Sequence, residues 1–483
     1  MSEKTVKEKQ KPNFIEAVSM LLVLLAAVVV CVKADINIIP AMIVAIVWAL
    51  IIAMKCGYTY NEIMEPVWDR CRGVVEIFLI ILAIGMFVGA MIYSGTIPTI
   101  IYYLIKIVSP AMIVVLSFLL TTIVGIIIGT SWGTAGTVGV IMLSIAASMN
   151  VPMAIVAGAI ASGTHVGQLC SPMSDTSNVC ANFAEVDTMT MIKRMAYYTV
   201  PTIVIATVLY LVLGLGNGNA GASLEQVDLI RKEISTVFNT NPLVILPMVF
   251  VFFLTFKKKP ILPTLTLASL VGVLFGMVFN HFSFVEGLHT LYNGFSLETT
   301  AGLSAEGFSD IFLNLVNRGG AMSMINAALI IIVATVYGTI LYEVKAVNVI
   351  ADVLFKHVKS RPAMCLSTIV VAGLVVALTS SSFLAEMMPK DLFGEKFKEN
   401  GADLMDLVSS EATASTQFLT CIPWCDTAIF LAGLSGVPTL QALPYNFFGW
   451  GCAVMALILS VLGIGWKSGK RFFALNSTKT AEN

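Results

Sequence analysis

The sequence predicts an all-α membrane protein that contains two inverted-topology repeats, with broken helices or re-entrant segments near the membrane midplane. Three observations lead to this fold class. Of the 483 residues, 57% are apolar and only 12% are charged, whereas about 25% are charged in an average soluble domain. One motif occurs twice, half a chain apart. Matched loops in the two halves carry different charge, as expected when the halves cross the membrane in opposite directions.

Apolar runs of the length that crosses a bilayer as a helix, about 20 residues, occur throughout the chain. They lie at residues 14–32, 36–54, 74–92, 112–129, 195–215, 242–256, 261–279, 321–341, 363–378 and 448–466. Lysines precede the first run, but no small-residue cleavage site follows it. We therefore interpret the first run as a retained helix rather than a signal peptide.

The pattern C-x-P-x-x-D-T at residues 170–176 recurs at residues 421–427, 251 positions later. Two other segments match at nearly the same spacing: residues 89–93 with 338–342, and residues 212–216 with 461–465. Repeated matches at one spacing indicate an internal repeat. The alternative is accidental similarity between two unrelated halves.

Loop charge indicates orientation, because Lys and Arg collect in cytoplasmic loops. Lys55, Arg70 and Arg72 precede the third span, whereas residues 281–320 hold one Arg and four acidic residues. The next loop reverses this order, with Lys106 in the first half and four basic residues at 345–361 in the second. We therefore expect a multi-pass protein of the cytoplasmic membrane with both termini in the cytoplasm.

The expected organisation has five parts. They are a cytoplasmic tail (1–13), a first transmembrane repeat (14–216), an extracytoplasmic connecting loop (217–241), a second transmembrane repeat (242–466) and a second cytoplasmic tail (467–483). The chain contains no Walker motif, so an ion gradient is the expected energy source. None of its nine cysteines forms a C-x-x-C pair, which argues against a zinc site or a disulfide framework.

Two polar breaks interrupt the first half. Small and hydroxylated residues at 129–137 let the chain leave helical geometry, so the hydroxyls there offer hard oxygen ligands to a small cation. The second break surrounds Pro172. The candidate ion ligands of both breaks are Thr130, Ser131, Thr134, Ser171, Ser174, Asp175 and Thr176. Among these we expect Na⁺ at Asp175, Thr176 and Ser131.

Asp175 is the first choice for coupling sodium to protons. Desolvation disfavours a charged carboxylate and a bound cation favours it, so one Asp can release a proton when sodium arrives. The alternative is that Asp175 caps the helix that follows the break. Asp426, beside Thr427, has the same two interpretations in the second half.

Substrate-binding or gating candidates flank the two breaks. They are His165, Gln168, Glu386, Ser381, Ser382, Gln417 and Trp424. His165 either shuttles protons or orients a substrate, Glu386 lines the cavity or lies at its mouth, and Trp424 is either a ligand platform or a packing wedge. We place the charged segment 390–406 in a hydrated loop with solvated carboxylates.

Three motifs carry a resemblance. Residues 129–134 read G-T-S-W-G-T, residues 171–178 read S-P-M-S-D-T-S-N, and residues 422–424 read I-P-W. In these motifs, and in their order over nearly the whole chain, the sequence resembles the NhaC-type sodium/proton antiporter family of the ion transporter superfamily. The resemblance implies a secondary transporter that exchanges Na⁺ and H⁺, not an enzyme, and no cofactor.

The sequence departs from the family pattern at two positions. The family has an Asp where this chain has Gln168, and it has Asn-Thr where this chain has Cys425 and Asp426. One carboxylate is thus lost from one break and another is gained in the other.

The resemblance also implies an alternative function, because the family includes exchangers of small carboxylates such as malate and lactate. In that case the chain is a Na⁺- or H⁺-coupled carrier of a small organic anion or an amino acid. A channel is the third class, although paired broken helices suit alternating access better. The expected partners are Na⁺, H⁺ and lipid. The net charge of −1 gives no indication of nucleic acid, and the sequence leaves open whether the chain forms a homodimer.

Overall fold

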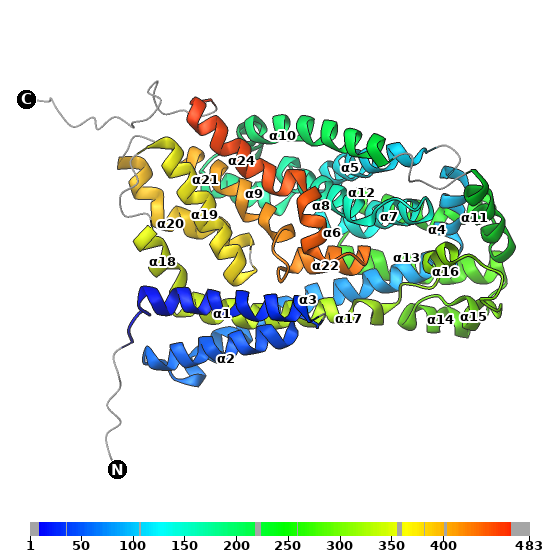
Figure 1. Ribbon diagram of the computed structural model, residues 1–483, viewed down its shortest axis with the longest axis horizontal. Helices are drawn as coiled ribbons and strands as arrows, with labels where there is room; N and C mark the ends of the chain where they lie inside the picture. Colours follow the sequence, from blue (N-terminus) through cyan, green and yellow to red (C-terminus); the bar gives the residue numbers. More distant parts are fainter. Residues whose placement is uncertain are drawn as a thin grey trace, which may run out of the picture.

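The computed structural model describes residues 9–34, 36–105, 108–217, 224–257, 259–354, 360–380, 382–399 and 403–464. Helices make up most of these ranges, which contain no strand (Figure 1). Within them, nine helices are long and apolar enough to cross a membrane, or up to 11 if each of two sharply bent helix pairs counts as one span. The predicted all-α, multi-pass fold with broken helices is confirmed.

The first half of the chain consists of helices joined by short connections. The first half holds α1 (Phe14–Lys33), α2 (Ile39–Lys55), α3 (Tyr60–Tyr93), α4 (Thr96–Leu104), α5 (Pro110–Ile128), α6 (Ser131–Thr134), the π-helix η1 (Ala135–Gly139), α7 (Val140–Ser148), α8 (Met153–Cys170), α9 (Asp175–Phe183) and α10 (Thr188–Asn217). Helix α11 (Leu224–Val237) follows, within the segment expected to be a connecting loop.

The second half has more short helices than the first. It holds η3 (Pro242–Ile245), α12 (Leu246–Phe256), α13 (Ile261–Asn280), α14 (Phe284–Asn293), α15 (Leu297–Ala301), α16 (Asp310–Val316), η4 (Ala321–Met324), α17 (Ile325–Glu343), α18 (Ala346–Leu354), α19 (Arg361–Thr379), α20 (Ser382–Glu399), α21 (Leu404–Ser415), η5 (Gln417–Thr420), α22 (Asp426–Ser435), α23 (Thr439–Ala442), η6 (Leu443–Tyr445) and α24 (Phe447–Leu462).

Helix α3 is much longer than the apolar run that predicted it. It begins at Tyr60 rather than near residue 74, because Thr59 and Glu62 form a capping box. The Thr59 side chain accepts a hydrogen bond from the Glu62 backbone, and the Glu62 side chain accepts one from the Thr59 backbone. A capping box satisfies two backbone donors at once, so the helix starts well before the apolar residues.

The backbone repeats with the same spacing as the sequence motifs. Four pairs of residues with positive φ are 250 or 251 positions apart: Gly57 and Gly307, Gly95 and Lys345, Gly129 and Ser380, and Glu185 and Gly436. A left-handed conformation is costly for residues other than glycine. Its presence at Lys345, Ser380 and Glu185 therefore indicates that both halves fold through the same turns.

The two copies of this repeat run in opposite directions. Tyr58, just before α3, donates a hydrogen bond to the Glu343 carbonyl at the end of α17 (3.4 Å). At the other end, the Gly320 amide, just before α17, donates to the Gly85 carbonyl (2.7 Å). The start of α3 thus lies beside the end of its counterpart α17, so the two are antiparallel. This arrangement is the one that inverted repeats require.

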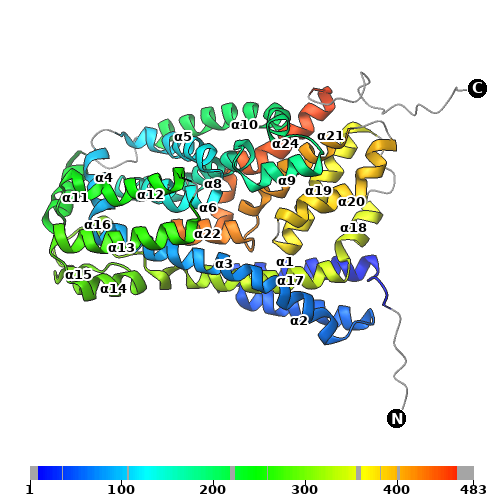
Figure 2. The same cartoon turned by 180° about the vertical axis from the view of Figure 1, so that it is seen from behind.

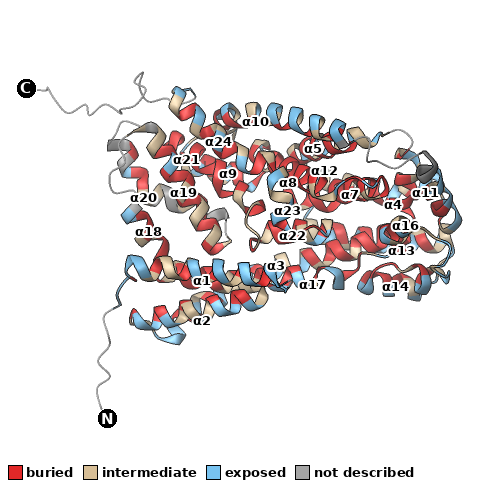
Figure 3. Cartoon of the chain, in the orientation of Figure 1, coloured by how far each residue is buried: buried red, intermediate tan, exposed pale blue. Residues whose placement is uncertain are grey.

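The helices between the spans gather at opposite ends of the molecule. Figure 1 and Figure 2 show α11, α14, α15 and α16 at one end, and α18 and α20 at the other, where α1 begins and α24 ends. At the first end, Glu233 of α11 accepts a hydrogen bond from the Ser309 hydroxyl (2.7 Å). Exposed residues line the outer faces of α2 and α10 in Figure 3, and many are large and apolar, as lipid contact requires.

The α3–α17 crossing depends on glycine at position 85. A methyl group on Gly85 would lie 2.3 Å from the Gly320 carbonyl oxygen, so we expect Gly85→Ala to lower the unfolding free energy by about 1–3 kcal/mol. Gly73, on the same helix, has no neighbouring atom within 4 Å. The control Gly73→Ala should raise stability slightly, because alanine favours a helix by ~0.5–1 kcal/mol. Thermal unfolding in detergent measures both changes, and equal melting temperatures would contradict the crossing.

Candidate functional site

In each half, the end of the incoming helix and the C-x-P-x-x-D-T loop together form one break. The breaks of the two halves, called the first and the second break from here on, are built in the same way. Helix α5 ends at Gly129 with φ 82°, and a methyl group there would lie 2.9 Å from the Ser174 amide nitrogen. Helix α19 ends at Ser380 with φ 51°, and the Ser380 hydroxyl donates to the Trp424 carbonyl (3.3 Å). In each half, the residue that ends the incoming helix thus contacts the C-x-P-x-x-D-T loop.

Asp175 and Asp426 are each the first residue of the helix after the break. Ser174, not Asp175, is the N-cap of α9, and its hydroxyl accepts a hydrogen bond from the Ser177 amide (3.5 Å). Asp175 is exposed and Asp426 half-buried. Asp426 accepts a hydrogen bond from the Thr427 hydroxyl (3.0 Å). The capping role considered for Asp175 therefore belongs to Ser174.

A polar network joins the first break to the second repeat. The Gln168 side-chain amide donates to the Thr176 hydroxyl (3.2 Å), and Thr176 hydrogen-bonds to the Glu386 carboxylate. The Thr416 hydroxyl donates to the same carboxylate (3.2 Å). Glu386 is only 2% exposed and lies within electrostatic range of Asp175. Glu386 thus lines the interface between the repeats and is not at a solvated mouth.

The surroundings of Glu386 are acidic. Cys180 of α9 lies near both Glu386 and Glu411, and Glu411 is fully buried on α21. No Lys, Arg or His of the described residues forms an ion pair with Glu386. This arrangement suits a bound cation or proton better than an anion.

Sequence reasoning did not select Thr416 and Glu411. Both belong to the polar run at residues 411–417, from which only Gln417 was selected. The repeat spacing carries a signal for one of them, because Thr416 lies 251 positions after His165. Mapping each candidate of one break onto the other half would have selected Thr416, whereas Glu411 corresponds to Ile160 and gives no such signal.

The prediction of a loop at residues 390–406 is wrong, although Glu395 is exposed as predicted. Residues 390–399 belong to α20, and Asp406 is fully buried in the first turn of α21. Its carboxylate forms an ion pair with Arg194 of α10, which is 8% exposed. Arg194, which directly precedes the apolar run at residues 195–215, therefore lies inside the protein. A charged side chain tolerates burial when it is paired, and a partner 212 residues away leaves no local sequence signal.

Several predicted residues carry buried polar atoms that make no hydrogen bond within the described part of the chain. His165 is fully buried, and its Nδ1 lies 3.2 Å from the Ala161 carbonyl, but its Nε2 has no partner. The other such atoms are the Ser131 hydroxyl, the Gln168 carbonyl and both amide atoms of Gln417. Buried polar atoms are usually hydrogen-bonded, so such exceptions point to a water or an ion.

The remaining candidates make mainly local contacts. Thr130 caps α6, Thr134 donates to the Thr130 carbonyl (2.8 Å), and the Ser171 hydroxyl accepts from the Met173 amide (3.1 Å). Ser381 lies outside the described residues, as does the side chain of Ser382. Of the three expected sodium ligands, Asp175 and Thr176 lie near Glu386. Ser131 lies on α6, and no contact joins it to this network in the described structure.

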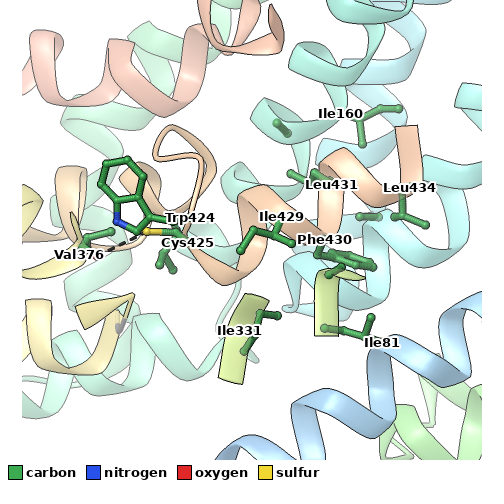
Figure 4. Close-up of a cluster of buried hydrophobic side chains, with 14 of the residues drawn as sticks. Ile81, Ile160, Ile331, Val376, Trp424, Cys425, Ile429, Phe430, Leu431 and Leu434 are labelled. Carbon is green, nitrogen blue, oxygen red and sulfur yellow. Dashed lines mark hydrogen bonds between the residues drawn. The ribbon is translucent and has the colours of Figure 1, made fainter. Parts of the chain in front are cut away.

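Trp424 packs rather than lining an open site. Its indole NH donates to the Ala377 carbonyl (2.6 Å), and the side chain is 5% exposed. Figure 4 shows Trp424 beside Cys425, whose thiol donates to the Val376 carbonyl, while Phe430 and its neighbours continue the apolar cluster along α22. The ring of Trp132 from the first break stacks on Phe430, with centroids 4.7 Å apart.

The Arg194–Asp406 pair allows a test by a double-mutant cycle. Asp406→Leu alone would leave a buried guanidinium without its partner, so we expect a loss of about 3–5 kcal/mol in unfolding free energy. The double variant Arg194→Met/Asp406→Leu should recover most of that loss. Lys193→Met, at the exposed neighbouring position, serves as the control. Additive losses in the double variant would show that the two charges are not coupled.

Known proteins resemble this chain over nearly its whole length. The Na⁺/H⁺ antiporter family matches residues 2–184 and 163–464. A malate-2H⁺/Na⁺-lactate antiporter of Bacillus subtilis is 28% identical over 95% of this chain and 96% of the relative. The Na⁺/H⁺ antiporter NhaC of the same organism is 25% identical over 84% and 88%. An arginine/ornithine antiporter of Halobacterium salinarum is 30% identical over 85% and 83%.

These matches confirm the predicted resemblance and the prediction of a sodium/proton antiporter, and they indicate a transporter rather than an enzyme. The match covers both repeats and includes the two breaks and the network around Glu386. The chain belongs to the Na⁺/H⁺ antiporter family.

Proposed function

We propose that this protein exchanges Na⁺ for H⁺ across the cytoplasmic membrane, and that Glu386 is the group that binds one or the other. The observation that supports this most is the position of Glu386, a buried carboxylate held by a hydroxyl from each repeat. A buried carboxylate without a basic partner requires a proton or a cation. It cannot hold both in the same place, and this competition is the basis of antiport.

The hydrogen bonds around Glu386 favour the binding of a cation by its carboxylate. Gln168 donates to Thr176, which leaves the Thr176 hydrogen directed at Glu386. The Gln168 carbonyl oxygen has no partner in the described structure. Carboxylate, hydroxyl and amide oxygens are the hard ligands that small cations prefer. Glu386, Thr176, Thr416 and Gln168 together offer such a set.

Asp175 has a different place in this proposal from the one that its sequence position suggested. It is exposed, lies next to Thr176 and interacts electrostatically with Glu386. A second carboxylate near the entrance attracts cations and helps to bind sodium. Asp426 and Thr427 occupy the matching position in the second repeat, and we propose that they contact the ion when the other side of the protein opens.

The positions of the charged loops support a cytoplasmic location for both termini. The acidic segment that forms α14, α15 and α16 lies with α11 at the end opposite the start of α1 (Figure 1). Lys and Arg collect in cytoplasmic loops, and this supports an extracytoplasmic position for α11 and α14–α16. No cofactor is part of the proposal, because the coupling ions are the transported species.

An organic solute is the second candidate. Relatives are named for malate and lactate or for arginine and ornithine, and the unpartnered polar atoms of His165 and Gln417 could orient such a solute. A dicarboxylate fits less well than a cation or an amino acid. Arg194, the buried Arg among the described residues, already pairs with Asp406, and the described groups that interact with Glu386 are acidic or neutral.

The first test compares two glutamates on α20. Glu386→Gln keeps the shape of the side chain but removes the exchangeable proton, so sodium-driven proton movement in proteoliposomes should fall about 100-fold or more. Glu395→Gln alters an exposed position of the same helix and should transport normally. Asp175→Asn should raise the sodium concentration needed for half-maximal rate. Normal exchange by folded Glu386→Gln protein would exclude Glu386 as the coupling group.

The second test separates the two candidate solutes. A ligand that binds only the folded protein stabilises it by about 2.7 kcal/mol at 100 times its dissociation constant. We expect sodium to raise the melting temperature of the wild type but not of Glu386→Gln, and millimolar malate, lactate, arginine or ornithine to have no effect. Stabilisation by one of these solutes that is lost in His165→Ala would favour the organic carrier.

A further inference from the structure

A small cavity lies between α8 of the first repeat and the bent pair α22–α23 of the second. Its volume is about 20 Å³, enough for one water molecule, since a water needs roughly 10–15 Å³. Ala157 and Ala161 line it from α8, and Ala428, Ala442, Thr420 and Asn446 line it from the second repeat. Helices α22 and α23 meet there at 87°.

The polar residues of this cavity lead towards the second break. Asn446 donates to the Thr420 hydroxyl (2.7 Å) and accepts from the Ser162 hydroxyl (2.9 Å). Thr420 directly precedes the C-x-P-x-x-D-T motif that ends at Asp426 and Thr427. The cavity thus connects the α22–α23 turn, where Gly436 and Pro438 are exposed, with the start of the motif.

The repeat relation gives the matching position on the other side of the protein. Ala157 corresponds to Val408, 251 positions later in the chain. Thr420, Ala442 and Asn446 correspond to Leu169, Met191 and Met195, 251 positions earlier. All four are buried, with 0–1% of their surface exposed. These four side chains are larger or more apolar, whereas Leu431 and Ser435 correspond to the smaller Cys180 and Ala184. The counterparts of Ala161, Ala432, Val437 and Thr439 are identical residues. At these four positions the counterpart site, called the filled side from here on, leaves less room than the small cavity does.

The same spacing shows how the filled side is held closed. Arg194 and Asp406, which form the buried ion pair, correspond to Tyr445 and Ile155, which carry no charge. One turn further along α10 and α21, the Tyr198 hydroxyl lies 3.4 Å from the Ser409 hydroxyl. Residue 409 corresponds to Gly158, which packs directly on the Tyr445 backbone. Among the described residues, two ion pairs join the repeats, the buried Arg194–Asp406 and the more exposed Lys390–Glu185, and both lie on the filled side.

We propose that the cavity is the extracytoplasmic end of the solute pathway, and that the Arg194–Asp406 pair closes the matching cytoplasmic end. This inference rests on the proposed transport function and its orientation. In the conformation described here, the solute would approach the site from outside. Release to the cytoplasm then requires α10 and α21 to separate and the ion pair to break.

The experiment uses two equivalent alanines as a matched pair. Ala161 lines the cavity, and Ala412 is its counterpart at a spacing of 251 residues, fully buried on the filled side. Each is changed to Cys in full-length protein whose nine native cysteines have been replaced. A small, membrane-impermeant cationic thiosulfonate is then added to right-side-out or inside-out vesicles, and the labelling rate is measured.

We expect Ala161→Cys to react from the extracytoplasmic face about tenfold faster than Ala412→Cys reacts from either face, because reactivity follows exposure. Adding Arg194→Gln and Asp406→Asn to Ala412→Cys should open it to the reagent from the cytoplasmic face. The charge-swapped pair Arg194→Asp/Asp406→Arg should restore protection, which distinguishes gating from misfolding.

Each outcome bears on a different claim. Absence of labelling at Ala161→Cys from outside, or equal labelling of the two alanine positions from one face, would overturn the pathway. Continued protection of Ala412→Cys in a folded double variant without the ion pair would overturn the gate. If labelling follows the expected pattern while vesicles show no sodium/proton exchange, the pathway stands and the proposed function fails.

Discussion

The Glu386 carboxylate, buried between two repeats with no basic partner among the described residues, restricts every segment around it. An isolated charge is costly at membrane depth, so its neighbours must supply hydrogen bonds and a route for an ion or a proton. Thr176 from one repeat and Thr416 from the other provide the hydrogen bonds. Because they come from different halves, any relative movement of the repeats changes the surroundings of the carboxylate. This property makes the site suitable for coupling ion binding to conformational change.

Broken helices make such a site possible inside a membrane. A helix that ends at midplane leaves backbone groups that must find partners within the protein. Here Ser174 caps α9, Thr130 caps α6, and Ser380 bonds to the Trp424 carbonyl. Each break packs against the opposite repeat, as the stacked rings of Trp132 and Phe430 show. Many hydroxyls expected to bind ions therefore have a structural task, and few remain free for an ion.

The sequence predicted the features that depend on composition and periodicity. The spans, the repeat spacing and the two breaks all appear in the structure. It could not show which polar side chains meet, because this depends on how the repeats dock. Glu386 was selected as a candidate, but the sequence did not show whether it lines the cavity or lies at its mouth. Asp406 was taken for a solvated carboxylate because it ends the charged segment 390–406, whereas its partner Arg194 comes from the other repeat. Charge density along the chain is a poor guide where distant helices neutralise each other.

The exchange of carboxylates between the two breaks has a physical explanation in this network. An Asp at position 168 would place another negative charge beside Thr176 and Glu386, where Asp175 and Glu411 already add to the acidic surroundings. Gln168 instead donates a hydrogen bond to Thr176 and so fixes the direction of the Thr176 hydroxyl towards Glu386. In the second break, Asp426 accepts a hydrogen bond from the neighbouring Thr427 hydroxyl. The two copies of the motif have thus become different: one orients a buried acid on the partner repeat, and the other carries its own.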